Sequence, residues 1–227
     1  MFPIGDDKLH GARTPYLCWI FIAINVFAFF HELSLSPAEL DAFIRHYGVT
    51  PVDILNGENY QSLITSMFLH GGWMHLIGNM LFLFVFGDNI EAVKGHGGFL
   101  LFYFLGGLAA SFAHIFFNPE SSIPSIGASG AISALLGAYL VWFPSSKIKV
   151  LVPIVFYLTV IRVNAFFFLF IWAAMQVLYG MASIGAQSAE TAGVAYWAHI
   201  GGFAFGLVVA LILRVTYPQM GNYKRVG

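Results

Sequence analysis

Long apolar segments recur along this chain, and each approaches the length that a helix needs to cross a membrane. A crossing of the ~30 Å hydrocarbon core takes about 20 residues in an α-helix. Six segments fit this requirement to within a few residues at each end, namely 15–31, 73–86, 98–117, 129–143, 164–181 and 196–213. The sequence therefore predicts an all-α polytopic membrane protein, a bundle of six transmembrane helices.

The composition supports lipid as the main solvent. Only 9% of the 227 residues are charged and 59% are hydrophobic, whereas a soluble domain carries about 25% charged residues. The net charge of -1 gives no indication of a nucleic-acid partner. Cys18 is the single cysteine, which excludes an internal disulfide and a cysteine metal cluster. The polar first 13 residues do not read as a signal peptide, so we expect the first apolar segment to remain as an anchor.

One further apolar stretch, residues 150–160, is about half the length of a membrane span and contains Pro153. We expect it to lie in the membrane interface or to lead into the fifth span. A seventh crossing is the alternative, which the distribution of charges disfavours.

Basic residues predict the orientation, because Lys and Arg gather on the cytoplasmic side of membrane proteins. Only Arg45 falls on the opposite side of a six-span arrangement. The other nine basic residues share one side: Lys8, Arg13, Lys94, Lys147, Lys149, Arg162, Arg214, Lys224 and Arg225. Residues 1–14 and 215–227 are therefore expected to be cytoplasmic tails of a membrane domain at 15–214. The first loop, 32–72, then faces outward, and its apolar piece 63–69 is expected to lie in the interface.

Polar residues within the spans are costly and usually functional. His75 and Asn79 share one helix face in the second span, Ser129 opens the fourth, and His199 lies in the sixth. At 1.5 Å per residue, Ser129, His199 and His75 lie about 21, 22 and 20 Å from the inner ends of their spans. All three therefore fall about 8–10 Å below the outer surface of a ~30 Å core. This shared depth predicts one site, provided that the three helices adjoin.

Small residues indicate that they do adjoin. Gly202 and Gly206 form a GxxxG step in the sixth span, and Gly130 begins a similar face in the fourth. General membrane-helix packing is the alternative reading of these glycines. Gly127 is grouped with them, and it is also expected to let the third loop turn down to the start of the fourth span.

The chemistry that fits these residues is nucleophilic catalysis. A serine hydroxyl needs a base to take its proton, and His199 is the only histidine in the sixth span. No Asp or Glu is expected within a span at this depth, which favours a Ser–His dyad over a triad. The Ser129 amide and the side chains of His75 and Asn79 are candidate oxyanion donors. Each residue has an alternative role: Ser129 as a helix N-cap, His199 as a buried histidine, and His75 with Asn79 as a contact between helices. We expect His70 at the outer interface, where its separation of five residues from His75 is a poor angle for a shared metal site.

Together these motifs resemble those of the rhomboid family of intramembrane serine proteases, in its basic six-helix form with no added domain. The matching pieces are His75-x-x-x-Asn79, Gly127-Ala128-Ser129-Gly130 and Ala198-His199-x-x-Gly202-x-x-x-Gly206. The resemblance implies Ser129 as nucleophile, His199 as general base and then acid, and an oxyanion hole of His75, Asn79 and the Ser129 amide.

The same resemblance implies no metal and no cofactor. Substrates would be transmembrane segments of other membrane proteins, cut near the outer face. They would enter beside the fifth span, with the loop at about 183–195 as a cap. A bacterial inner membrane is the expected location.

The chain departs from the family pattern at two places. Tyr60-Gln61 stands where many members carry a Trp-Arg pair, and Ser133 stands where some members place a tyrosine against the histidine. The resemblance therefore leaves the group that orients His199 unidentified.

Two other functions are weighed. A non-catalytic rhomboid-like protein would bind and escort transmembrane helices, but such proteins usually lack the serine or the histidine, and this chain has both. A small-solute transporter would predict an inverted repeat, or broken helices that meet at the midplane. The sequence has no convincing repeat, and its polar cluster lies off-centre. An intramembrane serine endopeptidase is the favoured reading, while the substrate and oligomeric state are not indicated.

Overall fold

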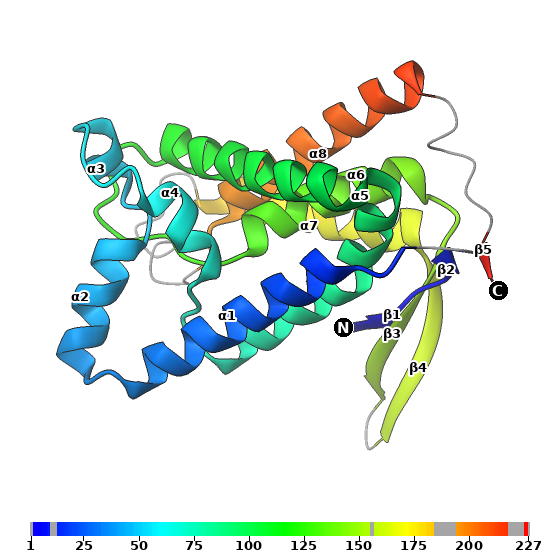
Figure 1. The fold of residues 1–227 in the computed structure, drawn as a ribbon, viewed down its shortest axis with the longest axis horizontal. Coiled ribbons are helices and arrows are strands. Elements are labelled where there is room, and N and C mark those ends of the chain that lie inside the picture. The colour runs from blue at the N-terminus through cyan, green and yellow to red at the C-terminus, as the bar shows by residue number, and fades with distance from the viewer. Residues whose placement is uncertain (1, 10–12, 155–156, 184–193, 218–224, 227) are drawn as a thin grey trace.

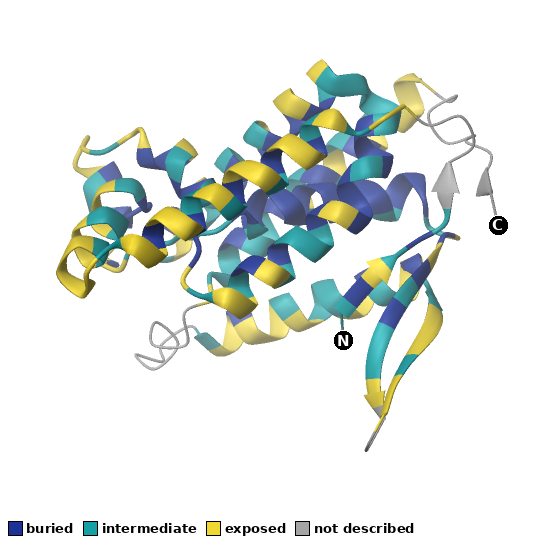
Figure 2. Ribbon diagram, turned by 60° about the horizontal axis from the view of Figure 1, so that its bottom comes forward, coloured by how far each residue is buried: buried dark blue, intermediate teal, exposed yellow. Residues whose placement is uncertain are grey.

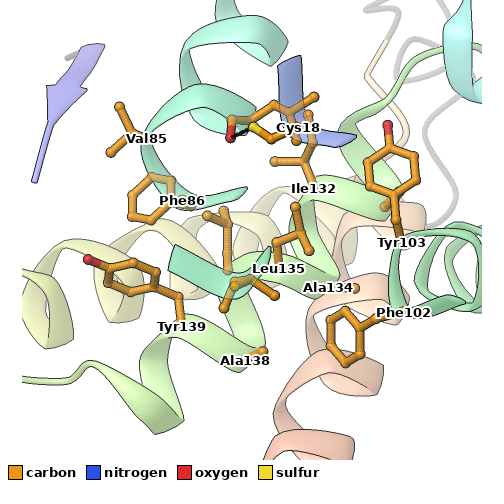
Figure 3. Close-up of a cluster of buried hydrophobic side chains, with 14 of the residues drawn as sticks. Cys18, Val85, Phe86, Phe102, Tyr103, Ile132, Ala134, Leu135, Ala138 and Tyr139 are labelled. Carbon is orange, nitrogen blue, oxygen red and sulfur yellow. Dashed lines mark hydrogen bonds between the residues drawn. The ribbon is translucent and has the colours of Figure 1, made fainter. Parts of the chain in front are cut away.

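Helix α6 (Ser129–Trp142) is the centre of a helical bundle (Figure 1). The computed structural model describes residues 2–9, 13–154, 157–183, 194–217 and 225–226. Twelve of the fourteen residues of α6 are buried, and the helix is apolar on every face. A helix that is hydrophobic all round is typical of a position enclosed by other helices. In Figure 3 its Ile132, Leu135 and Tyr139 lie among side chains from other helices.

The remaining long helices surround α6. They are α1 (Tyr16–Ser34), α5 (Trp73–Phe117), α7 (Ala165–Ser183) and α8 (Tyr196–Thr216). Helix α5 is interrupted at Gly95, whose φ of 68° and ψ of 168° are not helical. Glycine adopts this positive φ without steric cost. Two arms of α5 therefore account for the second and third predicted spans, and the six-helix prediction is confirmed.

The helix surfaces are those of a membrane protein. Among the described residues, four helices are long and apolar enough to cross a membrane, and α6 is a shorter apolar helix. Figure 2 shows exposed residues along the outward faces of the bundle. Large apolar side chains occupy these faces: Phe27 is 78% exposed and Phe116 is 76% exposed. Apolar area on this scale is stable only against lipid or another protein.

Helices α6 and α8 approach each other through glycine. A Cβ placed on Gly202 would strike the carbonyl oxygen of Gly130, and one on Gly206 would strike that of Ala134. A Cβ on Gly137 would likewise strike the α8 backbone at Phe203. These contacts bring the first turns of α6 and α8 together.

The first loop folds into short helices at the end of the bundle away from the termini (Figure 1). They are α2 (Pro37–Tyr47), α3 (Pro51–Leu55), α4 (Ser62–Thr65) and the 3-10 helix η1 (Ser66–Phe68). Ser36 begins α2 with a capping box, in which its hydroxyl accepts from the Glu39 amide. Val49, Ile54, Leu63 and Ile115 form a small apolar cluster under this loop. The loop thereby packs against the end of α5, where Ile115 lies.

A small sheet at the other end of the bundle corrects the sequence reading of residues 150–160. Strands β3 (Lys147–Ile154) and β4 (Tyr157–Asn164) form an antiparallel hairpin, and β1 (Phe2–Gly5) pairs with β3. A second pair joins β2 (Lys8–Leu9) to β5 (Arg225–Val226). A short apolar run does not distinguish a strand from a helical lead-in by its periodicity, and β1 lies far away in the sequence. The chain therefore adds sheet that the all-α prediction did not include.

The second span is also longer than predicted. Its apolar run ends at Phe86, but the helix continues to the turn at Gly95. Glu91, which is fully buried, accepts hydrogen bonds from the backbone amides of Leu17 at 3.0 Å and Cys18 at 2.8 Å. Glu91 therefore caps the start of α1, and it lies in the part of the helix that extends beyond the apolar run.

Candidate functional site

Ser129 and His199 form a hydrogen-bonded pair. Ser129 is the first residue of α6, and His199 lies in the first turn of α8. Nε2 of His199 lies 2.8 Å from Oγ of Ser129. The glycine contacts between α6 and α8 begin at Gly130, the residue after Ser129, and at Gly202, about one turn after His199, so they set this separation. Two residues 70 positions apart are thus within the distance that proton transfer requires.

The other ring nitrogen of His199 contacts α7. Its Nδ1 lies 2.8 Å from Oε1 of Gln176. The sequence reading did not identify Gln176. A signal was present, because Gln176 is the only amide side chain in the apolar helix α7, which holds no charged residue, and polar groups within spans usually have a role. The indole ring of Trp172, one turn earlier, lies 6.0 Å from the His199 ring between centroids.

His75 and Asn79 lie on the first two turns of α5 and face the same cavity. Gly71 donates its backbone N–H to Nδ1 of His75 at 3.3 Å. Nδ2 of Asn79, which is buried, lies 3.0 Å from Nε2 of His70. The structure therefore brings the residues predicted for the oxyanion hole to the same cavity as the Ser–His pair.

Gly127 lies outside the helix-packing interface with which the sequence reading grouped it. It precedes α6 with a φ of +128°, and its N–H donates to the Ser66 carbonyl at 2.8 Å. A Cβ added there would lie 2.7 Å from Nε2 of His75 and 3.6 Å from Oγ of Ser129. Gly127 therefore turns the loop into α6, as expected, and it leaves space between the imidazole and the hydroxyl. Gly130, Gly202 and Gly206 do lie in the packing interface.

His70 is buried, and both its backbone and its side chain make polar contacts. Its backbone N–H donates to both carboxyl oxygens of Glu32 at 3.2 Å, and its side chain contacts Asn79. Burial, with a smaller effect from nearby His75, lowers the pKa of His70 to about 3. The imidazole is therefore neutral near pH 7 and holds Asn79 without adding charge beside it.

The two departures from the family pattern are also placed. Ser133 is buried one turn after Ser129 and donates its hydroxyl to the Ser129 carbonyl at 2.6 Å. Its hydroxyl therefore bonds within α6, and the residue that contacts Nδ1 of His199 is Gln176. Tyr60 is exposed on the first loop.

A cavity of about 1140 Å³ connects these groups. Ser129, His199, His75 and Asn79 line it, together with apolar side chains such as Trp172. Ser183 and Val194 line it as well. The loop expected to act as a cap lies mostly at 184–193, outside the described residues.

Comparison with known proteins gives a consistent family. A sequence profile described as Rhomboid domain matches residues 57–216, which is more than half of the chain. The Rhomboid protease GluP of Bacillus subtilis (strain 168) is 34% identical over 127 residues, 56% of this chain and 24% of that protein. Rhomboid-like protein 11, chloroplastic, of Arabidopsis thaliana is 29% identical over 212 residues, 92% of this chain and 69% of that protein.

A third relative, the Putative rhomboid protease YdcA of Bacillus subtilis (strain 168), is 37% identical over 87 residues, 38% of this chain and 43% of that protein. Two of these three relatives are therefore matched over less than half of their own length. Their printed names include both proteases and a rhomboid-like protein.

Proposed function

The chain belongs to the rhomboid family, and on that premise we propose that it is an intramembrane serine endopeptidase that cleaves transmembrane segments of other membrane proteins. The observation that carries this proposal is the 2.8 Å contact between Ser129 Oγ and His199 Nε2. Ser129 is the nucleophile in this proposal. His199 takes its proton as the carbonyl is attacked and returns it to the leaving amine.

The oxyanion formed by that attack needs donors that are already in place. The Ser129 N–H is available because early helix amides have no partner within the helix. Gly71 donates to Nδ1 of His75, which supports a proton on Nε2, the nitrogen that faces Gly127 and Ser129. Asn79, held by His70, supplies a further amide donor.

The cavity supports a peptide substrate. Its volume of about 1140 Å³ accommodates several residues, and its apolar walls suit a segment that has left lipid. A backbone that enters must first unwind, because a helix conceals its carbonyls in hydrogen bonds. Substrates with small or helix-breaking residues near the cut are therefore favoured. Entry beside α7 is part of the proposal, since that helix exposes most of its length.

The orientation follows from the basic residues. We keep 1–14 and 215–227 as cytoplasmic segments of a membrane domain at 15–214, with the cavity toward the outer side. Lys147, Lys149 and Arg162 lie on β3 and β4, at the opposite end of the bundle from the short helices of the first loop (Figure 1). Residues of that loop line the cavity, which supports this orientation. We keep a bacterial inner (cell) membrane as the proposed location.

The test is cleavage of a model transmembrane substrate by purified protein in liposomes, with Ser129→Ala beside the wild type. We expect wild-type cleavage and none by the variant, and labelling of Ser129 by a fluorophosphonate in the wild type alone. Equal cleavage by the two proteins would overturn the proposal. Substrate binding without products from either protein would favour the helix-binding function instead.

A further inference from the structure

The histidine of the Ser–His pair has a defined partner on a third helix, and we propose that Gln176 is the positioning residue that holds His199 in its reactive tautomer. This inference rests on the proposed function. It identifies the group that performs, without a charge, the orienting task that a carboxylate performs in a catalytic triad.

The reaction requires one particular tautomer of His199. His199 accepts the Ser129 proton only if Nε2 carries a lone pair, which places the ring proton on Nδ1. An N–H at Nδ1 needs an acceptor, because an unpaired donor in this half-buried position is costly. Oε1 of Gln176, at 2.8 Å, is the acceptor.

A hydrogen bond within α7 orients the Gln176 amide. Its Nε2 donates to the carbonyl of Trp172, one turn earlier on α7, at 3.5 Å. The amide nitrogen is therefore directed at its own helix, and the oxygen is directed at His199. The hydrogen bonds run in one direction, from Ser129 Oγ–H to Nε2, from Nδ1–H to Gln176, and from Gln176 to Trp172.

Helix α7 approaches α8 closely at Gly180. Gly180 lies one turn after Gln176 on the same face of α7 and is buried against α8. A Cβ added to Gly180 would lie 3.0 Å from Cδ1 of Ile200, the residue that follows His199. The absence of a side chain at Gly180 thus brings Gln176 within reach of the imidazole.

The neutral amide also fits its surroundings better than an acid does. Helix α7 holds no charged residue, and a carboxylate in a membrane span carries a desolvation cost. Within the described residues, no hydrogen bond from an Asp or Glu reaches His199. An amide oxygen selects the tautomer without that cost.

The experiment compares Gln176→Met, Gln176→Glu and Gln176→Asn with the wild type in the liposome cleavage assay. Methionine keeps the length and packing but removes the acceptor, so we expect kcat to fall roughly 10-fold to 100-fold with little change in KM. Glutamate keeps an acceptor oxygen at the same reach, so we expect kcat within about 5-fold of wild type. Asparagine is one methylene shorter and should resemble methionine.

This order separates positioning from packing. A residue needed only for helix packing would tolerate methionine and lose function with glutamate, which is the reverse of our expectation. Leu178→Met is the matched control, because Leu178 is exposed on the same helix and should keep wild-type kcat. Fluorophosphonate labelling of Ser129 should slow in parallel with kcat in the methionine variant.

Wild-type kcat in Gln176→Met, equal losses in the methionine and glutamate variants, or better activity with methionine than with glutamate would each overturn the inference. None of these results affects the proposed function, which fails if Ser129→Ala cleaves as the wild type does or if neither of those two proteins gives products. The two claims therefore fail separately.

Discussion

Replacement of Asp6 by asparagine should flatten the dependence of stability on pH. Asp6 is buried between β1 and β2, and burial, reinforced by the nearby charge of Asp88, raises its pKa to about 7 from 3.8. Between about pH 4 and pH 7 the native state therefore binds more protons than the unfolded state. The free energy of unfolding falls as pH rises through this window and is level above it. The fall between pH 5 and pH 8 is about 2–3 kcal/mol for this group.

The hydrogen bonds around Asp6 explain why asparagine is the right replacement. Asn89 donates to Oδ2 of Asp6 at 2.5 Å, and the hydroxyl of Tyr139 donates to the same oxygen. The other oxygen is free to carry the proton. In the variant, the amide oxygen can accept both bonds while the NH₂ group replaces the protonated oxygen. Asparagine thus mimics the neutral acid at every pH.

The assay is the midpoint of thermal unfolding in detergent at pH 5 and pH 8. We expect the wild-type midpoint to be lower at pH 8 by roughly 5–10 °C from this group alone, and the difference to shrink by that amount in Asp6→Asn. Asp7→Asn is the control, since it removes the same formal charge at the neighbouring residue, whose carboxylate accepts from the Lys147 amide. An equal pH slope in wild type and Asp6→Asn would refute the reasoning.

Two further perturbations test the packing that supports the site. Glu91→Ala removes the acceptor for the amides of Leu17 and Cys18. It should lower the free energy of unfolding by about 3 kcal/mol, measured as a lower midpoint in the same assay. An unchanged midpoint would contradict the capping role. Gly206→Ala places a Cβ against the Ala134 carbonyl and should lower the free energy of unfolding by about 1–3 kcal/mol. Cleavage should fall more than the lower midpoint implies, because α6 and α8 separate. Full activity would contradict the link between this contact and the Ser129–His199 distance.

Much of the fold could be predicted because membrane spans are local features of a sequence. The ends of α7 and α8 lie within three residues of their predicted positions. Lipid imposes this directly, since a helix there must satisfy its own backbone and present apolar side chains. The sheet could not be predicted in this way, because β1 and β3 pair across more than 140 residues and strand pairing has no local signature.

Ser129, His199, His75 and Asn79 could be identified as one candidate group because buried polar residues in spans are rare and these share one depth. Depth follows from position along a helix, which the sequence states. Rotation of a helix about its axis and its distance from a neighbour do not, because they depend on packing with residues elsewhere in the chain. The contact of His70 with Asn79 could not be predicted for that reason, because it depends on the path of the first loop.

The sequence alone determined that the chain is a bundle of membrane helices, which of its residues are polar at one depth, and that α6 and α8 have faces of small residues. Only the tertiary structure decided that His199 meets both Ser129 and Gln176. Apolar content and helical rise are properties of each segment taken separately. The contacts of an imidazole between three helices depend on all three at once, through the glycine contacts that set how closely α6, α7 and α8 lie.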